Sequence, residues 1–280
     1  MAQAENAKKL DYTPVTYDDQ YILMVNQLKK YFPIKGGLMS QTVGHVKAVD
    51  GVTFNLKRGH TMGLVGESGC GKSTIAGILA AKNRGYTGRI TLGGVPLSEV
   101  AETDLMKHVV LVRHNSYLFK GTVEENLRMA KPDATKEEME AVLQKVNLLG
   151  FLQTQNGLQT ELLEKAGNLS GGQCQRLVIA RALLRSDSAV YIFDEAASNI
   201  DVESEELIMN VIHELAKTKT VLLISHRLAN VVQSDQIYFL KNGTICERGT
   251  HAELMEQNGA YRHLYDSQMV LENYGKEGNA

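Results

Sequence analysis

The sequence predicts an α/β fold, in which a mostly helical segment is inserted into a core of alternating strands and helices. Eight short apolar runs rich in β-branched residues, with helical stretches between them, indicate the alternation. These runs lie at residues 21–25, 46–54, 62–65, 89–92, 109–112, 190–193, 221–224 and 237–240. From residue 122 to residue 185 the pattern is mostly helical and interrupts the strand series, which predicts the insertion.

Helix starts and the chain ends set the expected domain boundaries. Helices are expected to begin at Thr122, Thr135 and Thr250, because each is followed three residues later by a glutamate, the pattern of a capping box. The first twenty residues have no apolar core, so they are not a secretory signal. We expect an N-terminal extension at 1–20, one domain at 21–274 with a helical subdomain at about 115–185, and a tail at 275–280.

Composition narrows the class of protein. Of the 280 residues, 43% are apolar and 22% charged, which is ordinary for a globular protein. The net charge of −2 gives no reason to expect a nucleic-acid partner, and no apolar run approaches the roughly 18 residues of a membrane span. Cys70, Cys174 and Cys246 have spacings that fit neither a disulfide framework nor a zinc site, which favours a reducing, cytosolic compartment.

A glycine-rich stretch behind an apolar run predicts a nucleoside-triphosphate site. It matches G-x-x-x-x-G-K-[ST] and consists of Gly66, Glu67, Ser68, Gly69, Cys70, Gly71, Lys72 and Ser73, with Thr74 next. Glycines let successive backbone N–H groups and the N-terminus of the following helix face a phosphate. Lys72 is expected to reach the β and γ phosphates, and Ser73 to offer its hydroxyl to Mg²⁺. A Gly-rich turn with an incidental lysine is the bland alternative.

Two carboxylates end the apolar run "AVYIFDE". A strand tip beside a phosphate-binding loop is where an aspartate can hold Mg²⁺, so Asp194 is assigned to the metal. Glu195, one residue later, is assigned to polarising the attacking water. Alone, the pair would be read as a solvated acidic turn, and its combination with the glycine-rich loop favours the catalytic interpretation.

The segment "NLSGGQCQR", residues 168–176, resembles the signature sequence of ABC (ATP-binding cassette) ATPases. "SNID", ending at Asp201, resembles the D-loop of that family, and His226 in "ISHRL" resembles its switch histidine. The order of glycine-rich loop, signature, Asp-Glu pair, D-loop and histidine is also the order in the family. The resemblance runs from about residue 21 to residue 268.

The resemblance implies a P-loop NTPase core of ABC type with an antiparallel β subdomain and an inserted helical subdomain. It implies that ATP and Mg²⁺ bind between two ATPase subunits paired head to tail. The signature of one subunit would then meet the nucleotide of the other, through Ser170, Gly171, Gly172 and Gln173. The partners implied are a second ATPase subunit and a transmembrane permease, with the chain peripheral on the cytoplasmic face of the membrane and no nucleic acid bound.

Two expected site residues are less usual. The family places an aromatic ring on adenine upstream of the P-loop, and Phe32 is assigned to this role with Tyr31 as runner-up. Where the family has a glutamine that binds Mg²⁺ and touches the nucleophilic water, this sequence has His114. Imidazole suits Zn²⁺ or Cu²⁺ better than Mg²⁺, and Asn115 could supply an amide oxygen instead. The substitution leaves full ATPase activity open.

The chain also resembles two branches of the family. Residues up to about 90 resemble ATPase subunits of oligopeptide and dipeptide importers, and the remainder resembles the ATPase part of exporters. "TELLEKAG" partly matches the exporter loop that meets the transmembrane domain, with Leu163 where glycine is usual. The leading hypothesis is an ATP-hydrolysing subunit of a membrane transporter. The alternatives are a soluble ABC ATPase acting on nucleic acid or ribosomes, and a cassette that only binds ATP.

Overall fold

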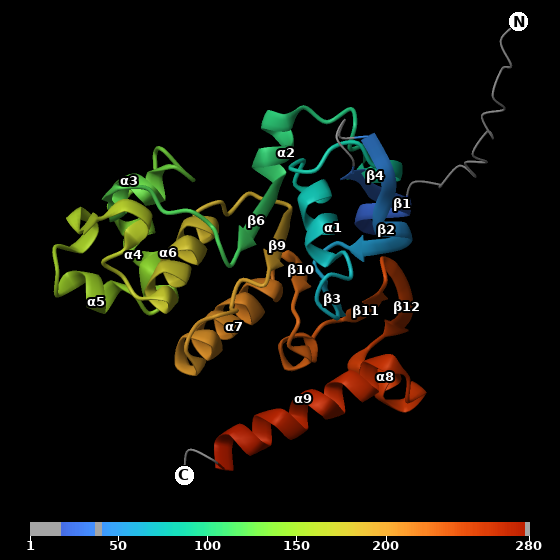
Figure 1. Ribbon diagram of the computed structural model, residues 1–280. Helices are drawn as coiled ribbons and strands as arrows, with labels where there is room; N and C mark the ends of the chain where they lie inside the picture. The colour runs from blue at the N-terminus through green and yellow to red at the C-terminus, as the bar shows by residue number, and fades with distance from the viewer. Residues whose placement is uncertain (1–17, 37–40, 278–280) are drawn as a thin grey trace, which may run out of the picture.

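A six-stranded sheet forms the centre of the computed structural model, which describes residues 18–36 and 41–277 (Figure 1). Its neighbours run in the order β12, β11, β3, β10, β9, β6. In chain order the bounds are β3 (Thr61–Gly66), β6 (Val109–Arg113), β9 (Val190–Asp194), β10 (Thr220–Ile224), β11 (Gln236–Lys241) and β12 (Thr244–Gly249). The strands pair in parallel except for β12, which lies antiparallel to β11 at one edge.

The two faces of the central sheet contribute to two separate apolar cores. Along β9, Tyr191 and Phe193 belong to one core, whereas Val190 and Ile192 belong to the other. All five residues of β9 are buried, as expected for a strand with both faces covered. The carboxyl ends of these parallel strands therefore meet at one well-supported edge.

A second sheet confirms the expected antiparallel β subdomain. It has the order β2, β1, β4, β5, with bounds β1 (Tyr21–Gly36), β2 (Gln41–Lys57), β4 (Thr87–Leu92) and β5 (Val95–Pro96). Its apolar residues and those of α1 (Lys72–Leu79) share one core with the central sheet. β1 and β2 extend well beyond the predicted runs, because their distal parts are exposed and held by strand pairing.

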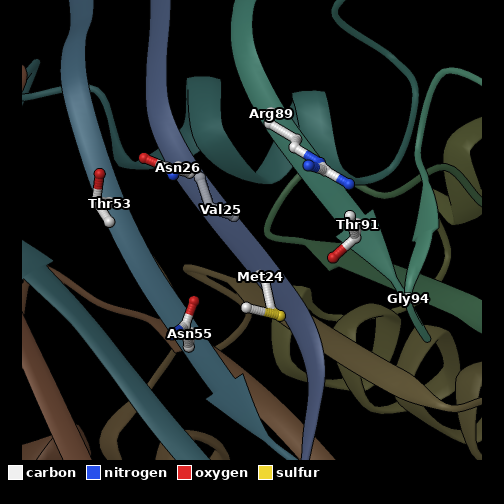
Figure 2. Close-up of a pocket in the computed structure, with 8 residues that line it drawn as sticks. All are labelled: Met24, Val25, Asn26, Thr53, Asn55, Arg89, Thr91 and Gly94. Atoms are coloured by element: carbon white, nitrogen blue, oxygen red, sulfur yellow. The ribbon is translucent and has the colours of Figure 1, made fainter. Parts of the chain in front are cut away.

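The antiparallel sheet carries a small pocket of its own, shown in Figure 2. The pocket has a volume of about 110 Å³ and is lined from β1, β2 and β4, with residues that include Met24, Thr53, Asn55 and Arg89. None of the sequence motifs contributes a residue to its wall. We therefore do not place the nucleotide there.

The helical insertion lies at the β6 edge of the central sheet (Figure 1). It contains α3 (Val123–Arg128), α4 (Lys136–Lys145), α5 (Leu149–Gln153) and α6 (Gly171–Leu183), with a short pairing of β7 (Gly121–Thr122) and β8 (Glu161–Leu162). The predicted capping boxes are present: Thr122 and Thr135 cap α3 and α4, and Thr250 caps α8 (His251–Gln257). α2 (Glu102–His108) precedes β6.

The remaining helices flank the other strands. α7 (Val202–Ala216) follows β9, the short helix η3 (Leu228–Val231) follows β10, and α9 (Ala260–Glu277) ends the described chain. α9 continues past the boundary expected at residue 274. Most of the extension expected at 1–20, and residues 278–280 of the tail, lie outside the described residues. Within the described residues, no helix combines the length and apolar character that a membrane crossing requires.

Candidate functional site

The glycine-rich loop joins β3 to α1 and passes too close to other backbone for side chains. At Gly66, φ is +144°, and an added Cβ would lie 2.1 Å from the carbonyl oxygen of Leu240. At Gly71, φ is +106°, and a Cβ would lie 2.1 Å from the carbonyl oxygen of Ala48. Only glycine fits these positions. These two glycines therefore shape the loop that leads into the N-terminus of α1, where backbone N–H groups can bind an anion.

Lys72, the first residue of α1, is 4% exposed. Its Nζ donates to the carbonyl oxygens of Gly66 at 2.7 Å and Glu67 at 2.9 Å, and lies 3.4 Å from Cys70 Sγ. Among the described residues, no carboxylate forms an ion pair with it. The loop thus holds a buried positive charge at a helix N-terminus, an arrangement that favours a polyanion such as a triphosphate.

Ser73 and Asp194 meet at the edge where β3 and β9 end. The hydroxyl of Ser73 donates to Asp194 Oδ1 at 2.9 Å, and Asp194 is 3% exposed. Burial raises the pKa of Asp194, while the Ser73 hydrogen bond and the guanidinium of Arg113 oppose that rise. A hydroxyl and a carboxylate oxygen side by side are hard donors of the kind that Mg²⁺ prefers. The pair fits the expected metal role.

Glu195 and His226 lie next to this pair. Ile224 at the end of β10 is in register with Asp194 at the end of β9, so the residues that follow each strand are neighbours. Glu195 has a φ of +52°, and its N–H donates to the carbonyl oxygen of Ile224 at 2.9 Å. Its Oε1 lies 3.6 Å from Nδ1 of His226, and both side chains are partly exposed. Strained backbone of this kind is concentrated at functional sites.

The signature segment builds the start of α6. Ser170 is its N-cap: the hydroxyl accepts from the N–H of Gln173 at 3.2 Å, and Gln173 Oε1 accepts from the N–H of Ser170 at 2.9 Å. Gly172 packs against the start of α7, because a Cβ there would lie 2.2 Å from Ser204 Oγ. Asp201, the expected D-loop residue, caps α7 by accepting from the N–H of Ser204 at 2.8 Å. Gly171 is exposed, and a Cβ there would make only an ordinary contact, 3.8 Å from Ile200 Cγ2.

The structure therefore places the motif residues in two separate groups. One group surrounds the carboxyl edge of the central sheet and consists of Lys72, Ser73, Asp194, Glu195 and His226. The signature belongs to the helical insertion, and within the described part of the chain no hydrogen bond or ion pair joins residues 170–173 to the P-loop.

The predicted adenine-binding aromatic is accessible. Phe32 on β1 is 40% exposed and pairs with Val46 on β2, two residues from Ala48, whose carbonyl contacts the P-loop. Lys30 Nζ lies 5.0 Å from the centre of the Phe32 ring. Tyr31, the runner-up, is occupied by a hydrogen bond from its hydroxyl to Asp50. The position favours Phe32, and its role stays a prediction.

Sequence reasoning passed over Arg113, which lies directly before His114. Arg113 ends β6 in register with Asp194, and its Nε lies 3.3 Å from Asp194 Oδ2. His114 and Asn115 occupy the exposed turn that follows. Arg113 could have been identified from the sequence as a basic residue at the end of a predicted strand, since such ends meet the Asp194 end of a neighbouring parallel strand. Of Arg113 and His114, it is Arg113 whose side chain contacts the Asp194 carboxylate, and the role of His114 remains a prediction.

Comparison with known proteins gives the family. The ABC transporter family matches residues 49–198, more than half of the chain. An uncharacterized ABC transporter ATP-binding protein of Haemophilus influenzae is 46% identical over 83% of this chain and 41% of its own length. An ATP-dependent lipid A-core flippase of Vibrio vulnificus is 42% identical over 78% of this chain and 38% of its own length.

A solved structure agrees with the sequence relatives. The structure of a bacterial Atm1-family ABC exporter with ATP bound superposes with a TM-score of 0.78 at 28% identity, covering 95% of this chain and 44% of that one. The chain thus spans about two fifths of the length of the relatives that it matches. The predicted fold class and the prediction of an ABC-type ATPase are confirmed at the level of the family. The chain belongs to the ABC transporter family and corresponds to its ATP-binding domain.

Proposed function

We propose that this chain hydrolyses ATP between two copies of the domain paired head to tail, and that this cycle powers a membrane transporter. The observation that carries the proposal is the grouping of Ser73, Asp194, Glu195 and His226 beside the buried charge of Lys72. The separation of the signature from the P-loop within one chain supports the pairing, since a second copy could bring its own signature to the nucleotide.

Each residue in the first group has a chemical task suited to its position. Lys72 and the loop N–H groups bind phosphate oxygens through charge-assisted hydrogen bonds. Ser73 and Asp194 would hold Mg²⁺, which when bound with ATP neutralises charge on the phosphates. Glu195 orients the attacking water and accepts its proton. His226 lies beside that carboxylate, with Nδ1 3.6 Å from Glu195 Oε1, and would help to position the same water.

The second group, the signature, would act across the dimer. α6 begins at Gly171, Ser170 caps it by accepting from the N–H of Gln173, and the helix dipole there favours an anion. Gly171 is exposed and carries no side chain, so the backbone of one copy could approach a phosphate bound to the other. ATP would then hold the two copies together, and hydrolysis would release them, which is a two-state switch.

Phosphate release tests the catalytic part. Glu195→Gln is expected to reduce turnover about 10²–10⁴-fold, the usual contribution of a general base. Glu206→Gln is a matched control, because Glu206 is an exposed glutamate on α7 that belongs to no motif. Equal turnover in Glu195→Gln and the control would contradict the assignment of Glu195.

We propose further that the transporter is of the exporter type, with a transmembrane partner docking on the helical insertion at the cytoplasmic face. The flippase and exporter among the relatives support the type. Phe119, Met129 and Leu163 are exposed apolar side chains in this region, 47%, 54% and 56% exposed. An apolar surface of this kind suits a cytoplasmic helix of a membrane protein.

Exposed apolar residues allow a direct test of docking. Leu163→Asp is expected to release the chain from membranes that contain the co-expressed permease, while ATP-driven dimerisation of the purified domain is unchanged. Val202→Asp, which replaces an exposed apolar residue at the start of α7, is the control. Full membrane retention of the Leu163 variant would contradict docking at this loop.

A further inference from the structure

The C-terminal helix α9 contacts the backbone of the segment that carries His226. The side-chain amide of Gln268 makes two hydrogen bonds there: Nε2 donates to the carbonyl oxygen of His226 at 2.7 Å, and Oε1 accepts from the N–H of Leu228 at 2.8 Å. Figure 1 shows α9 running beneath the loop that follows β10. From this pair of contacts we infer that Gln268 is a positioning residue for His226, an inference that rests on the proposed function.

The hydrogen bonds account for the turn at residues 225–228. The N–H of Arg227 donates to Ser225 Oγ at 2.9 Å, and that hydroxyl donates to the carbonyl oxygen of Arg227 at 2.9 Å. The carbonyl of His226 and the N–H of Leu228, on either side of Arg227, are the groups that Gln268 satisfies. The one side-chain amide of Gln268 thus bonds both backbone groups of the turn, because it supplies a donor and an acceptor.

The other attachments of the turn hold its neighbours. Arg227 forms an ion pair with Glu205 on α7, and Asn230 Nδ2 donates to the other oxygen of Glu205 at 3.1 Å. Leu228 is fully buried in the core. None of these contacts involves Gln268, so we expect the segment to stay folded when Gln268 is replaced. The bond to the carbonyl of His226 is the one that acts on the histidine residue itself.

His226 depends on its backbone for its direction. Glu195 Oε1, at 3.6 Å from Nδ1, lies beyond a good hydrogen-bond distance, and within the described chain no closer polar partner of the ring is found. The imidazole is also 47% exposed. A shift of the peptide at 226–228 would therefore move the ring relative to the water and to Glu195. Misplacement by about 1 Å can cost on the order of 10²-fold in rate.

Steady-state ATP hydrolysis by the full chain tests the inference. Gln268→Met removes both hydrogen bonds at similar volume, and Gln268→Glu keeps an acceptor for Leu228 while removing the donor to His226. We expect both to lower kcat about tenfold or more, with the Kd for ATP unchanged. Ser267→Ala is the control, because that exposed hydroxyl donates to the carbonyl of His263 on its own helix and, among the described residues, to no other group.

A double-mutant cycle shows through which residue Gln268 acts. In a His226→Ala background, Gln268→Met is expected to cause no further loss of kcat. An equal loss in both backgrounds, or normal kcat in both Gln268 variants, would overturn the inference. If His226→Ala and Glu195→Gln themselves hydrolyse ATP normally, the proposed function fails instead, which separates the two failures. Denaturation midpoints measured in parallel identify a variant that loses rate by unfolding.

Discussion

The two adjacent signature glycines should respond in opposite ways to alanine. Gly171 and Gly172 both lie in the first turn of α6. A Cβ at Gly171 would lie 3.8 Å from Ile200 Cγ2, which is an ordinary van der Waals contact. A Cβ at Gly172 would lie 2.2 Å from Oγ and 2.7 Å from Cβ of Ser204, and 3.0 Å from Asp201 Oδ2. The second position has no room for it.

The expected magnitudes follow from these distances. Alanine in place of glycine favours a helix by about 0.5–1 kcal/mol, so Gly171→Ala should stabilise the isolated chain by up to about that amount. Overpacking costs about 1–3 kcal/mol. Displacement of the start of α7 would also weaken the Asp201 cap, which is worth about 1 kcal/mol. Gly172→Ala should therefore lower the free energy of unfolding by about 1–3 kcal/mol.

Urea denaturation in the absence of nucleotide measures both effects. Ser204→Gly removes the two clashing atoms, so combining it with Gly172→Ala should recover part of the loss, giving a favourable coupling energy in the cycle. Equal stability of the Gly171 and Gly172 variants, or a strictly additive double variant, would refute the packing explanation. In either variant, ATP-driven dimerisation is a separate readout of the role across the interface.

Other predictions concern the nucleotide, the metal and pH. Lys72→Ala should raise the Kd for ATP at least about tenfold, since charge-assisted hydrogen bonds are worth about 1.5–3 kcal/mol, and an unchanged calorimetric titration would contradict this. His114→Gln should raise turnover and leave the Kd for ATP nearly unchanged, and a variant no faster, with a flat rate from pH 6 to 8, would remove His114 from the mechanism. Burial lowers the pKa of His251 below its usual 6.5, so the folded state binds fewer protons there than the unfolded state. The neutral His251 side chain should therefore contribute to the free energy of unfolding above about pH 6.5, and this contribution should be lost as pH falls below that value. His251→Gln should make the denaturation midpoint depend less on pH in this range.

Local patterns predicted the parts of the site that follow strands. The P-loop lies between β3 and α1, and the Asp-Glu pair ends β9, because an apolar run sets the strand and its last residues must leave the sheet at the same edge. The capping boxes at Thr122, Thr135 and Thr250 were likewise readable, since each depends on residues three apart.

The contacts that sequence reasoning missed join residues far apart in the chain. Arg113 reaches Asp194 only because β6 lies beside β9, and Gln268 reaches His226 only because α9 folds back under η3. The apolar periodicity of a segment predicts its secondary structure but not which distant segment it packs against. β12 lies outside the eight apolar runs for a different reason: it is an edge strand whose exposed and partly buried residues alternate, so it lacks a long apolar run.

Sedimentation of Glu195→Gln with and without Mg-ATP tests the central claim, that a second copy completes the nucleotide site. We expect a monomer without nucleotide and a dimer at saturating Mg-ATP. Adding Gly171→Asp should abolish the dimer while ATP binding persists, because a carboxylate suits the start of α6 but would repel the phosphate of the other copy. A monomer under saturating Mg-ATP, or a dimer that tolerates Gly171→Asp, would contradict the account.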